Sequence, residues 1–172
     1  ATDVLQSESR YLNAPYIKRT QTGQPWVIGK WAMTLDGKIA THLGDSRWIS
    51  GEPAREIVHR LRGRVDAILV GRGTVAADDP LLTARPPGPR PETRVVLDSN
   101  ATLSLDSQLV TTAQEAHVLI ASSTTAPTQS VQQLSEAGCE VLQLEGNQQQ
   151  RLSELLKELG RRDMTNVLVE GG

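Results

Sequence analysis

Short apolar segments alternate with amphipathic segments along most of this chain of 172 residues, and this alternation constrains its fold more than any other feature. Segments between the apolar runs show helical periodicity. Such alternation predicts an α/β domain with helices on the faces of a sheet and ligands beyond the carboxyl ends of the strands. The runs with the length and composition of strands are residues 26–32, 67–70, 93–98, 116–121, 140–144 and 166–170.

The first helix of the domain that starts at residue 26 is expected to begin near Ser50. Ser50 is placed to cap the first turn, Glu52 suits the helix dipole there, and Pro53 loses little by lacking an N–H. Four apolar residues at helical spacing predict one buried stripe, namely Ala54, Ile57, Val58 and Leu61.

Two later helices and one glycine-rich turn complete the pattern. A helix over residues 127–137 is expected to stop at Gly138, and a leucine-rich helix is expected to stop at Gly160. The strand at residues 67–70 runs into a glycine-rich turn, residues 71–74, and a helical start, a context that suits a phosphate. The leucines that form the stripe of the last helix are Leu152, Leu155, Leu156 and Leu159.

Composition indicates a single compact domain and excludes several partners. The chain has 18 Lys and Arg against 20 Asp and Glu, so its total charge does not favour nucleic acid or an anionic membrane. No apolar stretch is long enough to span a bilayer, and the first residues lack the pattern of a signal peptide. We therefore expect a cytoplasmic domain that contacts neither nucleic acid nor membrane.

Metal and disulfide chemistry find no support in the sequence. Cys139 is the only cysteine, so an internal disulfide and a multi-cysteine metal site are excluded. His42, His59 and His117 do not have ligand spacing. Residues 1–25 are polar and interrupted by turn formers, which predicts a short helix followed by an extended linker, with the domain starting at residue 26.

Five blocks, in order, resemble the reductase half of the bifunctional riboflavin deaminase-reductase family. Any one block would be a weak match, but the ordered set is specific. The resemblance implies a dihydrofolate-reductase-like fold with a central, mostly parallel sheet flanked by helices. It also implies reduction by NADPH of the ribosyl side chain of 5-amino-6-(5-phosphoribosylamino)uracil to the ribityl form. The blocks are residues 30–41, 44–50, 69–85, 94–99 and 167–172.

Lys30 and Glu170 are the candidate catalytic residues, because each ends an apolar strand and could project an ionisable group over a strand edge. Such a pair could orient the sugar or relay a proton. The alternative is an exposed ion pair at two strand ends.

The remaining site residues are implied by the resemblance. Arg62 and Arg85 match positions for the substrate phosphate, although each could be an ordinary surface charge. Apart from the resemblance, Arg72 lies beside the glycine-rich turn and could supply one charge to the 2′-phosphate of NADPH. The substrate set is Ser46, Arg62, Leu82, Arg85 and Glu170, and the cofactor set is Ala32, Trp48, Ser50, Thr74, Asp78, Ser99 and Gly172. Simpler alternatives are a core aromatic for Trp48, a turn for Asp78 and a helix cap for Ser50.

The resemblance also bears on partners and on the ends of the chain. Members of the family commonly form homodimers, and residues 1–25 resemble the tail that follows a fused deaminase domain. Members continue beyond Gly172 through a cofactor loop and closing strands, so we expect an incomplete cofactor cradle and unpaired sheet edges here. Two other functions stay open: a related reductase of another pterin or pyrimidine, and a non-catalytic folding or assembly module.

Overall fold

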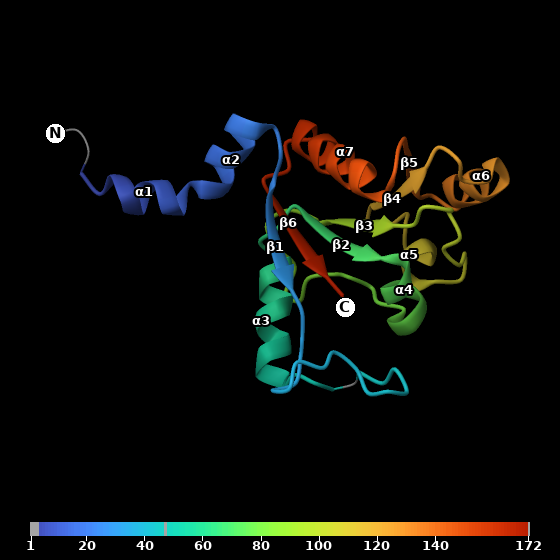
Figure 1. Cartoon of the computed structure of the whole chain (residues 1–172), viewed down its shortest axis with the longest axis horizontal. Helices are drawn as coiled ribbons and strands as arrows, with labels where there is room; N and C mark the ends of the chain where they lie inside the picture. Colours follow the sequence, from blue (N-terminus) through green and yellow to red (C-terminus); the bar gives the residue numbers. More distant parts are fainter. Residues whose placement is uncertain (1–3, 47, 172) are drawn as a thin grey trace.

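A computed structural model describes residues 4–46 and 48–171, and these residues form one sheet of parallel strands (Figure 1). The strand order is β1-β6-β2-β3-β4-β5, and every neighbouring pair is parallel. The predicted strands are therefore confirmed, with small shifts of their ends. Their bounds are β1 Trp26–Lys30, β2 Ala67–Gly71, β3 Thr93–Leu97, β4 Val118–Ser123, β5 Glu140–Leu144 and β6 Asn166–Glu170.

The register of the sheet sets which residues meet at its carboxyl edge. Lys30 lies opposite Glu170 at the ends of β1 and β6, and Gly71 lies opposite Leu97 at the ends of β2 and β3. Because all the strands run in one direction, these ends share one edge of the sheet. Functional groups from distant parts of the chain therefore come together there.

The alternation of side chains along the strands divides the core into two layers. On one face, Ile68 and Leu168 pack with side chains of α4, α5 and α6 and with Leu61 of α3. On the other face, Leu69 and Val167 pack against Leu155 and Leu159 of α7. The helices are α3 Glu52–Arg62, α4 Arg72–Asp78, α5 Gln108–Thr111, α6 Thr128–Glu136 and α7 Gln148–Arg161.

The start of α3 corrects two predictions. Its N-cap is Gly51, without a side-chain cap, and Ser50 instead accepts a hydrogen bond through its carbonyl from Arg55 at 2.7 Å. The expected apolar stripe is not buried along its length, since Ala54 is exposed and Ile57 is 64% exposed. Only the C-terminal part of the stripe, at Leu61, reaches the core, because α3 runs past the edge of the sheet.

The end of α7 corrects a third prediction. The helix continues through Gly160 to Arg161 instead of stopping at the glycine. A Cβ atom at Gly160 would lie 1.9 Å from the carbonyl oxygen of Gly23. The glycine therefore permits a close approach of helix and N-terminal segment, and does not end the helix.

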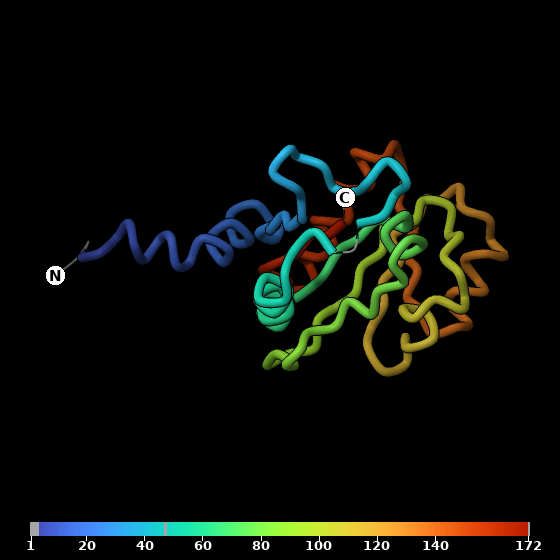
Figure 2. Tube along the Cα trace, turned by 90° about the horizontal axis from the view of Figure 1, so that it is seen from below, coloured from blue at the N-terminus to red at the C-terminus, as the bar shows by residue number. Residues whose placement is uncertain are grey.

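The N-terminal segment contains two helices where one and a linker were expected. They are α1 Gln6–Leu12 and α2 Ala14–Thr22, and α1 extends away from the rest of the molecule (Figure 2). Only α2 reaches the sheet, where Lys18 lies over the ring of Trp26 at 5.9 Å. No helix among residues 4–46 and 48–171 has the length and apolar character needed to cross a membrane.

A charged cluster fastens the end of α7 to β5. Arg162 donates to both carboxylate oxygens of Glu140 at 2.6 and 2.9 Å and to Glu158 at 2.9 Å. His117 lies 3.0 Å from the same Glu140 carboxylate. The hydrogen bonds from Arg162 are the main reason why the pKa of Glu140 is lowered.

We predict that this cluster makes the stability of the fold depend on acid. A lowered carboxyl pKa stabilises the folded state above the ordinary glutamate pKa of about 4.3, and this contribution disappears as the pH falls through the lowered value. Arg162→Gln should lower the free energy of unfolding by less than about 1 kcal/mol at pH 7, because Arg162 and Glu140 are both partly exposed. The loss should be smaller still near pH 3. Urea unfolding across this range measures the difference, with Arg64→Gln, an exposed arginine outside the cluster, as the control. If Arg162→Gln lowers the free energy of unfolding equally at pH 7 and pH 3, the ion pair with Glu140 is not the source of the acid dependence.

Candidate functional site

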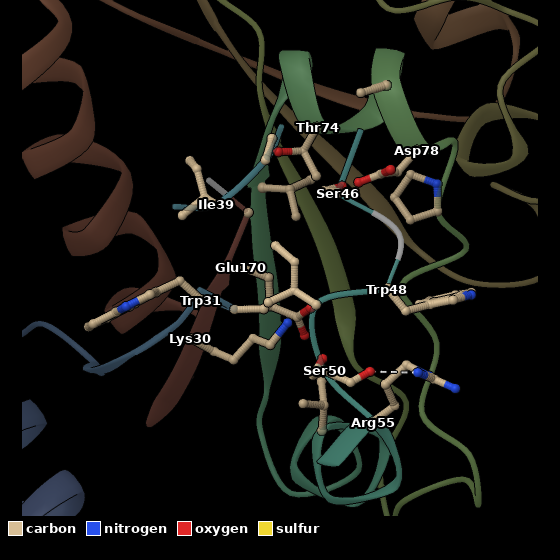
Figure 3. Close-up of a pocket in the computed structure, with 18 of the residues that line it drawn as sticks. Lys30, Trp31, Ile39, Ser46, Trp48, Ser50, Arg55, Thr74, Asp78 and Glu170 are labelled. Atoms are coloured by element: carbon tan, nitrogen blue, oxygen red, sulfur yellow. Dashed lines mark hydrogen bonds between the residues drawn. The ribbon is translucent and has the colours of Figure 1, made fainter. Parts of the chain in front are cut away.

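A cavity of about 600 Å³ lies across the carboxyl ends of β1, β6 and β2 (Figure 3). Its walls come from the ends of these strands, the inner face of α3, the start of α4 and the loop between β1 and α3. Among the residues predicted for the site, Lys30, Ala32, Ser46, Trp48, Ser50, Arg62, Thr74, Asp78, Leu82 and Glu170 line the cavity.

Glu170 is the buried anion of the site, with 8% of its surface exposed. Strand alternation puts it on the same face as Leu168, toward α3. There Arg62 meets it with two parallel hydrogen bonds, Nε to Oε1 and Nη2 to Oε2, each 2.8 Å long. This two-pronged geometry fixes the plane of the carboxylate and compensates its burial. The alternative of an exposed ion pair at two strand ends is therefore wrong for Glu170.

Lys30 completes a polar centre beside this pair. Its place opposite Glu170 in the parallel register brings both side chains to the same face of the sheet. Figure 3 shows the Lys30 amine directed toward the Glu170 carboxylate. Both candidate catalytic residues thus line the same cavity, and Arg62 binds Glu170 from α3.

Trp48 forms an aromatic wall of the cavity. Its side chain is 72% exposed, so the alternative of a core aromatic is wrong. The guanidinium of Arg55 lies 4.3 Å from the centre of the Trp48 ring, while its Nη1 holds the carbonyl of Ser50 at 2.7 Å (Figure 3). Arg55 therefore ties the loop to α3 and holds the ring by a cation–π contact.

Two tight turns shape the loop that carries Trp48. The Thr34 amide donates to the Lys38 carbonyl at 2.9 Å, and the Lys38 amide donates to Oγ1 of Thr34 at 3.0 Å, which closes a turn at Gly37, whose φ is +78°. A similar turn closes at Gly44, whose amide donates to the carbonyl of Thr41 at 2.9 Å. These turns return the chain to the cavity at Ser46.

The glycine-rich turn after β2 leaves open space next to the cavity. A Cβ atom at Gly73 would meet no atom within 4 Å, whereas one at Gly171 would lie 2.6 Å from Oγ1 of Thr74. Gly171 also has a φ of +115°, which favours glycine. The backbone after β6 thus lies close against the first turn of α4, and Asp78 lines the cavity one turn further along.

Three predicted residues are not among those that line the cavity of the described chain. Arg85 is exposed on the loop before β3, and Ser99 lies beyond the end of β3. Gly172 falls outside the described residues. Leu82 does line the cavity, with 2% of its surface exposed and a left-handed φ of +55°.

Sequence reasoning missed two residues of α3. Arg55 and His59 line the cavity with Arg62, at helical positions i, i+4 and i+7. The same spacing rule that suggested an apolar stripe would have found this basic face. His59 also has a buried Nδ1 with no hydrogen-bond partner among the described residues. Among the described lining residues, Lys30, Arg55 and Arg62 face two carboxylates, Asp78 and Glu170, so the cavity suits an anionic ligand.

The fold and this cavity define a parallel α/β domain with a candidate ligand site at the carboxyl edge of the sheet. The family profile described as "RibD C-terminal domain" matches residues 25–172. The chain therefore belongs to the RibD C-terminal domain family, and the predicted resemblance and the predicted fold class are confirmed.

Individual relatives also match almost the whole length of the chain. Riboflavin biosynthesis protein RibD of Actinobacillus pleuropneumoniae is 41% identical over 98% of this chain, which spans 45% of that protein. RibD of Aquifex aeolicus is 35% identical over 98% of this chain, which spans 46% of that protein. This chain thus spans a little under half the length of these relatives.

A solved structure supports the fold independently. It is the diaminohydroxyphosphoribosylaminopyrimidine deaminase/5-amino-6-(5-phosphoribosylamino)uracil reductase of Thermotoga maritima, with a TM-score of 0.79 and 35% identity. The match covers 98% of this chain and 45% of that one.

We predict that Arg62 is needed to keep Glu170 buried. Arg62→Gln should cost about 3 kcal/mol of unfolding free energy, because it leaves a buried carboxylate without its partner. In the double variant with Glu170→Gln, the cost should be smaller than the sum of the two single costs. Urea unfolding measures these values, and Arg60→Gln, from an exposed pair on the same helix, is the matched control. Additive costs would show that the two side chains do not interact.

Proposed function

We propose that this domain reduces the ribosyl side chain of 5-amino-6-(5-phosphoribosylamino)uracil with NADPH, as a step of riboflavin biosynthesis. The observation that carries the proposal is the polar centre of Lys30, Glu170 and Arg62 beside Trp48, in a chain of the RibD C-terminal domain family. The name of the Thermotoga maritima relative includes this reductase activity.

The cavity has features that fit a nicotinamide dinucleotide. The exposed ring of Trp48 offers a flat apolar surface, and the open space at Gly73 next to Thr74 leaves room for a phosphate against backbone amides. The proposed cofactor residues at the cavity are Ala32, Trp48, Ser50, Thr74 and Asp78, and Ser99 and Gly172 are proposed for parts of the cofactor beyond it. When bound, the nicotinamide of the cofactor would provide the hydride, and these residues would hold it.

The residues of the chain supply orientation and protons. Glu170, held by Arg62, presents a carboxylate of fixed plane that can accept hydrogen bonds from sugar hydroxyls. Lys30 can donate a proton to the heteroatom on which negative charge develops. Ser46 and Leu82 form further parts of the proposed substrate site.

The substrate phosphate requires cations. Arg62 donates two of its five N–H groups to Glu170, and Nη1 approaches the Thr83 carbonyl at 3.5 Å. We propose that its remaining N–H groups contribute to phosphate binding together with Arg85, which would have to approach the cavity from its exposed loop.

The proposal extends to the longer protein and its setting. Because the relatives are about twice as long as this chain, we propose that the domain functions fused to a deaminase domain, with residues 1–25 as the connecting tail. We also propose a homodimer in the cytoplasm.

Cofactor binding is the first test of the proposed function. Titration with NADPH, followed by tryptophan fluorescence, should show saturable binding tighter than that of NADH. Trp48→Phe should remove much of the signal, because the exposed Trp48 ring forms a wall of the cavity, whereas Trp26→Phe, at the far end of β1, should retain it. Failure to bind either cofactor, also with an extended C-terminus, would contradict the proposal.

Lys30 provides a test of the chemistry. Lys30→Met should lower kcat for the phosphorylated aminopyrimidine by about 100-fold or more, since it removes the proposed proton donor, while NADPH affinity stays nearly constant. Lys38→Met, at an exposed loop position, is the matched control. An unchanged kcat in Lys30→Met would remove Lys30 from the mechanism.

A further inference from the structure

Ser99 and Arg151 meet at the carboxyl edge of the sheet, although 52 positions separate them in the sequence. Ser99 follows β3, and Arg151 lies in the first turns of α7. Nη2 of Arg151 donates to Oγ of Ser99 at 2.9 Å. Val95 and Leu97 of β3 pack on the side of α7, so the end of this strand leads Ser99 toward the same helix.

Both residues are held in place by the backbone around them. The carbonyl of Ser99 accepts a hydrogen bond from the amide of Ser123 at 2.9 Å, which ties it to the end of β4. At the start of α7, Asn147 and Gln150 form a reciprocal cap with hydrogen bonds of 3.0 and 2.8 Å. Arg151 also donates to the carbonyl of Gly146, just before this cap. The pair is therefore preorganised before any ligand arrives.

The guanidinium of Arg151 keeps its charge available. Its contacts are a hydroxyl and a carbonyl, and no ion pair links it to a carboxylate among the described residues. The nearby Asp98 is 3% exposed, and its carboxylate accepts the amides of Thr102 and Leu103 at 2.6 and 2.7 Å. Since a guanidinium has five N–H donors, Arg151 retains donors for a ligand.

We infer that Arg151 and Ser99 bind the 2′-phosphate of NADPH and thereby set the preference for NADPH over NADH. This inference rests on the proposed function, in which the nicotinamide end occupies the cavity. The step from β6 to β3 is two strand spacings, roughly 10 Å, which a dinucleotide lying across the carboxyl edge can span. A phosphate monoester matches a guanidinium fork beside a hydroxyl, whereas the 2′-hydroxyl of NADH leaves the charge of Arg151 uncompensated.

Arg151 takes this role in place of Arg72, which the sequence suggested. Arg72 is exposed at the first position of α4. Arg151, by contrast, is half-buried and donates one hydrogen bond to the Ser99 hydroxyl and one to the Gly146 carbonyl. A positioned guanidinium loses less conformational entropy on binding a phosphate than a free surface side chain does.

The test separates the 2′-phosphate from the rest of the cofactor. Binding of 2′,5′-ADP and of 5′-AMP is measured by calorimetry for the wild type, Arg151→Gln, Arg151→Lys and Ser99→Ala. The wild type should bind 2′,5′-ADP more tightly than 5′-AMP. Arg151→Gln should weaken the affinity for 2′,5′-ADP by about 10-fold or more, as expected for the loss of a hydrogen bond to a charged group. Its affinity for 5′-AMP should change little. Arg151→Lys should keep part of the affinity for 2′,5′-ADP. Arg161→Gln, near the other end of α7, should bind it as tightly as the wild type.

The outcomes distinguish this inference from the proposed function. If Arg151→Gln retains the wild-type preference for 2′,5′-ADP and for NADPH, the inference is overturned while the reductase function stands. Equal binding of 2′,5′-ADP and 5′-AMP by the wild type would also overturn it. Thermal unfolding of each variant verifies that a lost preference does not come from a lost fold. Loss of turnover with a retained phosphate preference would count against the reductase function alone.

Discussion

The insertion of β6 between β1 and β2 is the constraint on which the rest of the structure depends. β6 is the last strand in the chain, yet it hydrogen-bonds to β1 on one side and to β2 on the other. Its apolar residues Val167 and Leu168 are fully buried, one in each layer of the core. The return of the chain across the sheet through α7 makes this possible, and it brings the end of β6 to the middle of the site.

This placement of β6 has a cost in folding free energy. A strand that ends between two others carries its last side chain into a region of low solvent access, and here that side chain is the carboxylate of Glu170. A buried carboxylate is tolerated only with partners, so the fold needs Arg62 from α3. The same ion pair that compensates the burial also orients the carboxylate toward the cavity. Stability and the proposed chemistry thus depend on one contact.

The sheet could be predicted from the sequence more fully than the helices and the site. Apolar runs located the strands of the described residues, and most clearly the inner ones, β2, β3, β4 and β6, because strands buried on both faces contain few polar residues. Periodicity located α3 but overestimated how much of its apolar stripe is buried, because Ile57 is exposed while Arg55 and His59 meet the cavity. Hydrophobic patterns identify what can be buried, but they do not indicate where the core ends.

The contact between Ser99 and Arg151 could not be predicted from local sequence patterns at all. Neither residue stands out locally, since a serine after a strand and an arginine near the start of a helix are ordinary surface residues. Their relation arises only when β3 and α7 are stacked, which the alternation of Val95 and Leu97 against Leu155 dictates. Arg151 has no carboxylate partner among the described residues and donates to a hydroxyl at a half-buried position, so its charge is available to an anion. The position of the proposed anion subsite therefore follows from packing and from charge, and from neither alone.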